Sequence, residues 1–382
     1  MSEATQIARG LEGVVVARSA ISYVDGKLGR LIYQGYDIRE LAEHSSFEEV
    51  AFLLWHGRLP DSRELAALKE ELTSSRTVPQ AVIELIKLVP PRSPMAVLQT
   101  AVAALGLFDP EADDNSREAN LRKSVRLTAR VATLVAAFHR LRRGLAVVEP
   151  DPQLGHSANF LYMLFGERPD ETSARVMDVA LILHADHEFN ASCFAGRVTA
   201  STLSDMYSSV ASAVGTLKGP LHGGANEQVM RLLMEIGDPG RAAEVVHAKL
   251  TAKERIPGFG HRVYKTWDPR ALILKRYSEE LGRQRGDMRW YQISVAVEEA
   301  VRAEKDLYPN VDFYSASVYH ILGIPIDLFT PVFAVSRISG WTAHLLEQYA
   351  DNRLIRPRAE YSGPFDLRYV PVEDRPPHEA TA

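Results

Sequence analysis

The sequence contains a single cysteine, Cys193, among its 382 residues. No disulfide can form within the chain, which is typical of proteins from reducing compartments. No apolar run approaches the roughly 20 residues that cross a bilayer as a helix. The opening residues, MSEATQIARG, lack the basic and apolar regions of a secretory signal. We therefore expect a cytoplasmic protein with no membrane partner.

The sequence also lacks an excess of positive charge. Lys and Arg number 44 against 49 Asp and Glu, which gives a formal net charge of −5. A mildly acidic chain produces no long-range field that gathers nucleic acid, so we expect no nucleic-acid partner. A local cationic pocket for a small anion is still compatible with this balance.

The first forty residues contain runs of β-branched and aromatic residues, and no convincing strand pattern follows them. They flank Asp25-Gly26, a dipeptide typical of hairpin turns. From Ser46 onward apolar residues recur at helical spacing, and helix-start signals follow one another. They include a capping box of Ser46 and Glu49, and Asp268 before a proline at the first helical position. The sequence predicts a mainly α protein with a small N-terminal β element.

Several segments read clearly as helix, loop or arm. Predicted helices cover RVMDVALILHADHE, TLSDMYSSVASAVGTLKG, NEQVMRLLMEIGDPG, WDPRALILKRYSEELG and TPVFAVSRISGWTAHLLEQY. Residues 108–120, FDPEADDNSREAN, are acidic and polar, which indicates a surface loop. Residues 364–382 are rich in proline and charge, so we expect an extended arm.

Two histidines lie on glycine-rich turns. His222 lies in GPLHGGANE, and His261 ends IPGFGH ahead of cations at Arg262, Lys265 and Arg270. Glycines let a ligand approach the backbone closely, and a helix N-terminus after such a turn favours an anion. Taken alone, each stretch is equally compatible with a plain turn or a solvated basic loop.

Charged residues stand at unusual places in further stretches. Asp312 in NVDFYS precedes an apolar helical run, where it is either a helix N-cap or a functional carboxylate. Arg337 lies inside the apolar FAVSRISGW, so it needs a partner or a polar cleft. Arg356 and Arg358 flank a proline in RPRAEY. Arginine forks bind carboxylates at two points, so these residues indicate a substrate with more than one carboxylate.

A metal site is the alternative for LHADHEFNAS. His184 and His187 stand three residues apart there, and such a pair on a helix can bind a metal ion. The spacing His-Glu-x-x-His is absent and no third histidine follows at a suitable offset, so we expect no metal site. Histidines in polar segments are expected on the surface, namely His44, His139, His247 and His378.

Taken together, the motifs GPLHGGAN, PGFGHRVYKTWDPRA, NVDFYS and RPRAEY, in this order and spacing, resemble citrate synthase. The resemblance covers nearly the whole chain. It implies a nearly all-α homodimer whose subunits have two helical domains and an active site in the cleft between them. The implied large domain covers 1–222 and 318–382, and the implied small domain covers 223–317.

The resemblance also implies a reaction. Acetyl-CoA and oxaloacetate condense, and citryl-CoA is hydrolysed to citrate and CoA without a cofactor, as in the tricarboxylic acid cycle. The related 2-methylcitrate synthases use propionyl-CoA, and Ala316, His320 and the segment TPVFAVSRISGW also resemble them. One methylene is worth only ~1–3 kcal/mol of discrimination, so a preference for propionyl-CoA or dual activity stays open.

The resemblance assigns catalytic roles residue by residue. His222 matches the histidine that hydrogen-bonds the thioester carbonyl, and Ser192 the residue that orients it. His261 matches the histidine that polarises the keto group of oxaloacetate, and Asp312 the base that removes the methyl proton.

Other residues are matched to substrate binding. The implied carboxylate ligands of oxaloacetate are His187, Arg270 and Arg337, with Arg356 delivered from the partner subunit. Arg262 and Lys265 match contacts to CoA. A non-catalytic CoA- or polycarboxylate-binding protein and a metal-dependent hydrolase that uses His184 and His187 are the other hypotheses.

Overall fold

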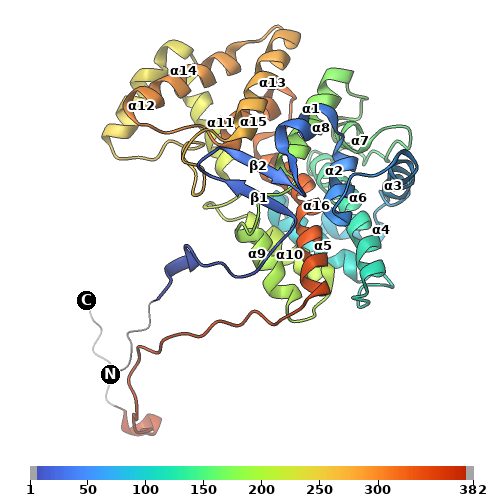
Figure 1. Cartoon of the computed structure of the whole chain (residues 1–382), viewed down its shortest axis with the longest axis vertical. Coiled ribbons are helices and arrows are strands. Elements are labelled where there is room, and N and C mark those ends of the chain that lie inside the picture. Colours follow the sequence, from blue (N-terminus) through green and yellow to red (C-terminus); the bar gives the residue numbers. More distant parts are fainter. Residues whose placement is uncertain (1–6, 376–382) are drawn as a thin grey trace.

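The computed structural model describes residues 7–375, and sixteen α-helices account for most of them (Figure 1). The predicted mainly α class is therefore confirmed. In chain order the helices are α1 (Ile38–His44), α2 (Phe47–His56), α3 (Ser62–Ser74), α4 (Gln80–Leu88), α5 (Pro94–Gly106), α6 (Arg117–Arg142), α7 (His156–Phe165), α8 (Glu171–His184), α9 (Ala191–Ala200), α10 (Met206–Leu217), α11 (Ala225–Ile236), α12 (Ala242–Thr251), α13 (Pro269–Arg285), α14 (Arg289–Glu304), α15 (Val311–Ile321) and α16 (Phe329–Ala350).

A small antiparallel sheet precedes the helices, as predicted. Its strands are β1 (Ser22–Asp25), β2 (Arg30–Tyr33) and β3 (Tyr36–Asp37), in the spatial order β1-β2-β3. Strands β1 and β2 form a hairpin in which Ser22 pairs with Tyr33. The predicted Asp25-Gly26 turn connects them, so a local turn signal was sufficient to locate the hairpin.

Local signals also set the ends of the helices. The hydroxyl of Ser46 accepts the N–H of Glu49, whose carboxylate accepts the N–H of Ser46, so the predicted capping box begins α2. Gly57 ends this helix with a φ of 75°, a conformation that costs glycine nothing sterically. Asp268 caps α13 by accepting the N–H of Arg270, also as predicted.

Helix α16 runs through the core of the larger part of the molecule. It packs against α2, α6, α8, α9 and α10. Nearly all of its side chains between Phe329 and Leu346 are buried. A helix that is covered all round must satisfy its polar groups internally, and α16 carries Arg337 and His344 at such positions.

Helices α11 to α15 form a second group, beside the hairpin in Figure 1. Within it, α15 packs on α11 and α13, and α12 packs on α14. The group adjoins the rest through contacts of α13 with α1 and α8, and of α11 with α16. It spans Ala225 to Ile321 and so overlaps the segment 223–317 predicted for the small domain, whose end at 317 falls inside α15. The division into two domains stays a prediction.

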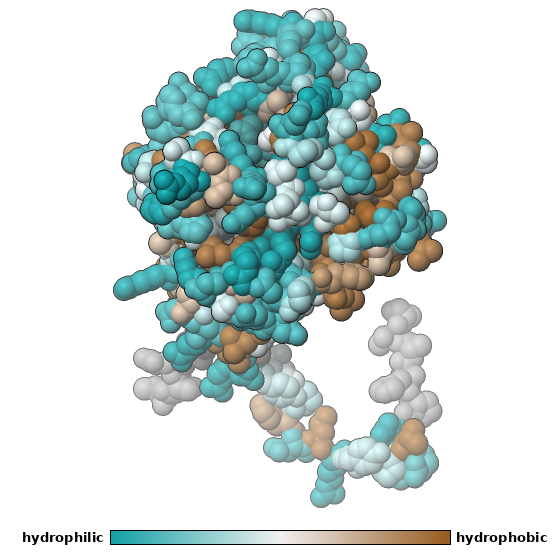
Figure 2. Space-filling model, turned by 90° about the vertical axis from the view of Figure 1, so that its right-hand side faces the viewer, coloured by the Kyte–Doolittle hydropathy of each residue, from teal (hydrophilic) through white to brown (hydrophobic). Residues whose placement is uncertain are grey.

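Beyond α16 the chain leaves the body as an extended arm (Figure 1). Residues 351–375 hold one short 3₁₀ turn, Val372–Asp374, and are exposed nearly throughout. The arm and the segment before β1 expose apolar side chains (Figure 2), among them Val15, Leu354, Phe365, Leu367 and Val372. The predicted arm is confirmed as far as Arg375, and the remainder, with His378, lies outside the described residues.

Two surface predictions need correction. The loop predicted over 108–120 is shorter, because α6 begins at Arg117 with Ser116 as its N-cap. His139 was expected on the surface but is only 3% exposed, because neighbouring helices cover its face of α6. Burial lowers the pKa of His139 to about 4. His44 and His247 are exposed as predicted.

Gly340 allows α16 to touch the segment that follows α8. A Cβ atom at this position would lie 2.2 Å from the carbonyl oxygen of Ala185 and 2.6 Å from Oδ1 of Asp186. Gly340→Ala should therefore destabilise the fold by ~2 kcal/mol or more, although alanine favours a helix by roughly 1 kcal/mol over glycine. Urea unfolding measures this change. Gly196→Ala in α9 is the matched control, because its nearest contact would lie at 3.3 Å, and equal losses in both variants would contradict the close packing.

Candidate active site

His222 lies in the turn between α10 and α11, and its ring is fixed by Ser192. The backbone N–H of Ser192 donates to Nε2 over 3.2 Å, and the Ser192 hydroxyl lies 2.8 Å from the same nitrogen. The indole N–H of Trp341 donates to that hydroxyl over 3.1 Å. Because Nε2 accepts an N–H, the ring proton resides on Nδ1. Burial and then the charge of Arg337 lower the pKa of His222 to about 4, so the ring is neutral at neutral pH.

The glycines around His222 have a structural use. The N–H of Gly223 donates to the carbonyl of Leu217 over 3.0 Å. A Cβ atom at Gly223 would lie 2.3 Å from that carbonyl oxygen, so a side chain is excluded. The segment is thus a tight end to α10, and a residue with a side chain would not fit after His222.

His261 is held with the opposite tautomer. Its Nδ1 accepts the backbone N–H groups of Val263 over 3.0 Å and Tyr264 over 3.1 Å. The ring proton therefore resides on Nε2. Burial and then the charge of Arg270 lower the pKa of His261 to about 4. The ring meets His187 edge-on, with 5.1 Å between the centroids.

The loop that carries His261 is fastened on two sides. The N–H of Lys265 donates to the carbonyl of Gly26 in the hairpin over 2.8 Å. The side-chain amide of Asn310 donates to the carbonyl of Gly260 over 2.9 Å. Since Asn310 immediately precedes α15, the start of this helix and His261 are held in one unit.

Asp312 lies in the first turn of α15. Its N–H donates to the side chain of Asn310 over 3.0 Å, so Asn310 is the N-cap and the alternative of Asp312 as a cap is wrong. Within residues 7–375, Oδ1 of Asp312 is buried and has no hydrogen-bond partner. Burial raises the pKa of Asp312 to about 7, although Arg270 and Arg337 oppose the shift. A desolvated carboxylate with this pKa can act as a base at neutral pH.

Arg270 is already paired within the chain. Its Nε donates to Oδ1 of Asp268 over 3.0 Å and its Nη2 to Oδ2 over 2.8 Å, and both residues are buried. Oδ2 of Asp268 also accepts the N–H of Val311 over 3.0 Å, which joins α13 to the start of α15. The sequence indicated Asp268 only as a cap. Its place two residues before an arginine was the signal for the ion pair.

Arg337 differs from Arg270 because no carboxylate of the described chain hydrogen-bonds it. Its Nε donates to the carbonyl of His184 over 2.6 Å, and the guanidinium lies over the ring of Phe333 at 4.6 Å. The residue is 1% exposed, and burial lowers its pKa. The other guanidinium nitrogens make no hydrogen bond among residues 7–375, so they are available to a ligand.

The charge of Arg337 acts on three other predicted site residues. After burial, it is among the causes that lower the pKa of His187 and His222, and it opposes the raised pKa of Asp312. The segments after α8 and α10 and the start of α15 therefore lie within electrostatic reach of this guanidinium. The structure brings together most of the predicted site, namely His187, Ser192, His222, His261, Arg270, Asp312 and Arg337.

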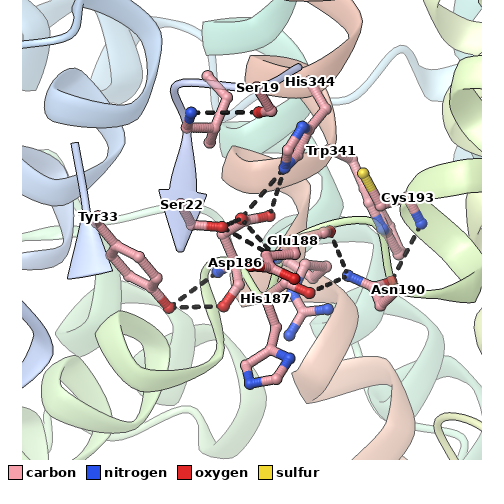
Figure 3. Close-up of polar contacts among 12 residues, drawn as sticks. Ser19, Ser22, Tyr33, Asp186, His187, Glu188, Asn190, Cys193, Trp341 and His344 are labelled. Carbon is pink, nitrogen blue, oxygen red and sulfur yellow. Dashed lines mark hydrogen bonds and ion pairs between the residues drawn. The ribbon is translucent and has the colours of Figure 1, made fainter. Parts of the chain in front are cut away.

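His187 lies in the segment 185–190 between α8 and α9 (Figure 3). The sequence predicted a helix through this stretch, but α8 ends at His184. The hydroxyl of Tyr33 donates to the carbonyl of Asp186 over 2.8 Å and accepts its N–H over 3.1 Å, which replaces helical hydrogen bonds. Nε2 of His187 lies 3.3 Å from the hydroxyl of Tyr264.

His184 and His187, the two residues of the metal alternative, have different contacts. His184 is fully buried, with Nδ1 2.8 Å from the carbonyl of Ala180 and its ring edge-on to Phe333, whereas His187 contacts Tyr264. Across the described residues, no group of three or more His, Cys, Asp or Glu side chains is placed to hold a metal ion. That the reaction needs no cofactor stays a prediction.

Three predicted ligands are exposed and make no hydrogen bond to the buried cluster among residues 7–375. Arg262 and Lys265 are exposed on the loop after His261. Arg356 is exposed on the arm that leaves the body (Figure 1). No contact among residues 7–375 joins Arg356 to the other site residues, so its role stays a prediction.

Sequence reasoning missed the residues that hold the site in place. They are Tyr33, Asp186, Asn190, Tyr264, Trp341 and His344. For Tyr33 and Trp341 no local signal existed, since their contacts join positions 153 and 149 residues apart. Asp186 and Asn190 stand next to His187 in ADHEFN, and that clustering of polar residues was the available signal.

His222, His261, Asp312 and Arg337 together define a class of chemistry. Two neutral imidazoles present N–H donors, a desolvated carboxylate can take a proton, and a buried guanidinium awaits an anion. Such a site can bind a carbonyl compound that carries carboxylates, remove a proton from carbon and stabilise the resulting oxyanion. Among residues 7–375 no carboxylate hydrogen-bonds Arg337, so this guanidinium would bind the carboxylate of the ligand.

Comparison with known proteins gives the family. The family model for citrate synthase, C-terminal domain, matches residues 10–358. The chain is 54% identical over 376 residues to the citrate synthase of Haloferax volcanii, which covers 97% of this chain and 99% of that one. It is 45% identical over 372 residues to a 2-methylcitrate synthase of Mycobacterium tuberculosis, with 97% and 94% covered. The solved ternary complex of carboxymethyl coenzyme A and oxaloacetate with citrate synthase from Thermoplasma acidophilum superposes with a TM-score of 0.92 at 36% identity, over 97% of this chain and 100% of that one. The chain belongs to the citrate synthase family and is an enzyme of that family.

The chain also contains, among residues 7–375, no helix long and apolar enough to cross a membrane.

Asp312→Asn tests how burial affects this carboxyl group. Because folding raises the pKa of Asp312 to about 7, its contribution to stability is present at low pH and is lost as the pH rises through that value. We expect the variant to raise the unfolding midpoint by about 2–4 °C near pH 8 and by less than half as much near pH 5, because the cost of ionising the buried carboxyl grows from its ordinary pKa up to about 7. Differential scanning calorimetry measures both. Asp306→Asn, at an exposed position, is the control, and identical midpoints for Asp312→Asn and wild type at both pH values would contradict the raised pKa.

Proposed function

We propose that this protein is a citrate synthase that condenses acetyl-CoA with oxaloacetate and hydrolyses citryl-CoA to citrate and CoA. The observation that supports it most is the pair of neutral imidazoles, His222 with its proton on Nδ1 and His261 with its proton on Nε2, beside the desolvated Asp312. Two carbonyl oxygens must be polarised in this reaction, and one carbon acid must lose a proton. The site supplies one residue for each task.

Oxaloacetate has two carboxylates and a ketone. We assign one carboxylate to Arg337, whose free N–H groups form a fork inside the protein. Arg270 and His187 lie beside the same space, and Arg270 is kept rigid by its two bonds to Asp268. His261 donates from Nε2 to the keto oxygen, which raises the reactivity of the keto carbon.

Acetyl-CoA supplies the nucleophile. Its methyl group is a very weak carbon acid, so a carboxylate can remove a proton only if the growing charge on the thioester oxygen is stabilised at the same time. Asp312 takes the methyl proton, and Nδ1–H of His222 donates to the thioester oxygen. The backbone N–H of Ser192 holds the ring from the other side, so the donor is aligned before the substrate arrives.

Bond formation and hydrolysis complete the sequence. The enolate carbon attacks the keto carbon, and the former keto oxygen takes the proton of His261 to become a hydroxyl. Water then attacks the thioester carbonyl and gives one proton back to His261. The carbon–sulfur bond breaks, the departing CoA sulfur takes the proton held by Asp312 to leave as a thiol, and the new carboxylic acid ionises. Hydrolysis of the thioester drives the overall reaction forward.

We further propose a cytoplasmic homodimer in which each arm completes the partner's site. Arg356 stands on an arm that leaves its own body and exposes apolar side chains that a second copy would cover. Arg262 and Lys265, exposed near His261, are positioned to meet the phosphates of CoA.

Propionyl-CoA is the alternative acyl donor, because the chain is also close to a 2-methylcitrate synthase. Ala316 is completely buried, about one helical turn after Asp312. It therefore contributes to the packing near the base. His320 stacks edge-on against Trp290 at 4.6 Å and takes no part in the site geometry described above.

The acyl preference is tested by release of free thiol from acetyl-CoA and propionyl-CoA in the presence of oxaloacetate. We expect kcat/KM for acetyl-CoA to be higher by about 10-fold or more, which a single methylene allows. His222→Ala is the control and should lose ~10²–10³ of kcat because it removes an oxyanion donor. A ratio near one or reversed would support the 2-methylcitrate reaction, and no release with either thioester would contradict the proposal.

The shared site is tested by mixing two variants. Arg356→Ala should raise the KM for oxaloacetate by about 10-fold or more through loss of a charge-assisted hydrogen bond, whereas Arg358→Ala, its neighbour on the arm, should change it little. Refolding Arg356→Ala together with His222→Ala should restore activity, because one mixed site then has both residues intact. If the mixture is no more active at low oxaloacetate than the sum of its two components, the arm serves its own chain.

A further inference from the structure

A second buried ion pair, Asp186 with His344, lies close to His187 (Figure 3). Asp186 is 0% exposed and His344 is 1% exposed. Nε2 of His344 lies 3.2 Å from Oδ2 and 3.1 Å from Oδ1 of the carboxylate. The hydroxyl of Ser22 and the N–H of Glu188, the latter over 3.2 Å, also donate to Oδ2. The mechanism above uses neither Asp186 nor His344.

Both members of this pair are charged at neutral pH. Burial alone would lower the pKa of His344, but the sulfur of Cys193 and the carboxylate of Asp186 raise it to about 10. Burial alone would raise the pKa of Asp186, but His344 and Arg337 lower it. The two charges therefore neutralise each other in the interior.

The other charged groups around His344 have partners of their own. On α16, Oε2 of Glu347 lies 4.0 Å from Nδ1 of His344, and Glu347 pairs with Arg197 of α9 over 2.9 Å. The further titratable groups that face the pair are Tyr33 on β2, Glu188 in the segment after α8, Cys193 on α9 and Arg337 on α16.

One face of α16 holds the segment 184–192 along its length. Arg337 bonds the carbonyl of His184, Gly340 touches Ala185, Trp341 bonds Ser192, and His344 pairs with Asp186. Since His344 follows Arg337 by about two helical turns, both reach the same segment from the same side. Asp186 is thus placed between a cation that faces the substrate and one that does not.

Two of the three buried cations at the site are neutralised by a carboxylate of the chain. Asp268 neutralises Arg270 through two hydrogen bonds, and His344 neutralises Asp186. Arg337 is left with a positive charge that no carboxylate of residues 7–375 hydrogen-bonds. After burial, Asp186 is the strongest influence on the pKa of Arg337, which shows how near its carboxylate is.

We propose that His344 is a charge-balancing residue of the substrate pocket, which occupies Asp186 and so leaves the guanidinium of Arg337 free to bind a substrate carboxylate. Without the imidazolium, Asp186 would pair with Arg337 and compete with the substrate. The inference rests on the proposed function, in which the substrate is the dianion oxaloacetate.

The experiment compares His344→Gln, Asp186→Asn and the double variant. Calorimetry measures the Kd for oxaloacetate, and thiol release measures the KM for acetyl-CoA at saturating oxaloacetate. His344→Gln should weaken oxaloacetate binding about 10-fold or more, as expected for the loss of a charge-assisted contact at Arg337, while the KM for acetyl-CoA stays within about twofold. Arg126→Gln, which breaks a partly buried ion pair with Asp109, is the matched control for general destabilisation.

The asymmetry between the two single variants is the signature. In Asp186→Asn no carboxylate remains to capture Arg337 and the buried His344 releases its proton, so the Kd should change by less than about threefold. The double variant should match Asp186→Asn and thus recover what His344→Gln loses. Equal weakening in both single variants indicates plain structural support, and no weakening in His344→Gln also overturns the proposal.

A second test follows oxaloacetate binding by the wild-type protein as a function of pH. As the pH rises through about 10, His344 loses its proton, Asp186 turns to Arg337, and oxaloacetate binding should weaken more in wild type than in Asp186→Asn. Parallel curves would contradict the proposal. A protein that binds oxaloacetate but releases no thiol would refute the proposed function and leave this test intact.

Discussion

An ionised side chain that leaves water costs several kcal/mol unless a partner replaces the lost hydration. The centre of this protein holds a set of such groups, namely Asp186, His344, Asp268, Arg270 and Arg337. Four of them form two closed pairs, and Arg337 remains without a carboxylate in the described chain. Asp312 meets the same constraint differently. It forms no pair with a cation, and burial instead raises its pKa. Arg337, which has no carboxylate partner in the described chain, and Asp312, whose buried carboxyl is difficult to ionise, are therefore the two groups available to a substrate.

The fold provides this arrangement through helix α16 and three connecting segments. These are the segment between α8 and α9, the turn with His222 between α10 and α11, and the loop with His261 before α13. Helix α16 is apolar and covered on all sides, so its few polar residues act where they contact the segment 184–192. The hairpin supports that segment through Tyr33 and supports the His261 loop through Gly26. Because these supports come from distant parts of the chain, the imidazoles keep fixed tautomers and stay neutral. Rigid, neutral donors suit a reaction in which charge develops on oxygen.

Much of this could be predicted from the sequence wherever the cause was local. The hairpin at Asp25-Gly26, the capping box at Ser46 and the cap at Asp268 depend on residues within a few positions, and all were confirmed. The family followed from four motifs in order. Features set by distant contacts could not be predicted: the end of α8 at His184 depends on Tyr33, and the burial of His139 depends on neighbouring helices. The pairing of Asp186 with His344 joins positions 158 residues apart, and no periodicity or spacing reports it.

The site histidines His222 and His261 are neutral, whereas the neighbouring His344 is charged. A ¹⁵N-labelled histidine NMR spectrum, recorded from about pH 6 to pH 8 and assigned with single histidine variants, measures this directly. We expect neutral rings for His222, protonated on Nδ1, and for His261, protonated on Nε2, across the whole range, with His344 doubly protonated throughout. Rings of His222 or His261 that take up a proton near the ordinary histidine pKa of about 6.5, or a neutral His344, would contradict it.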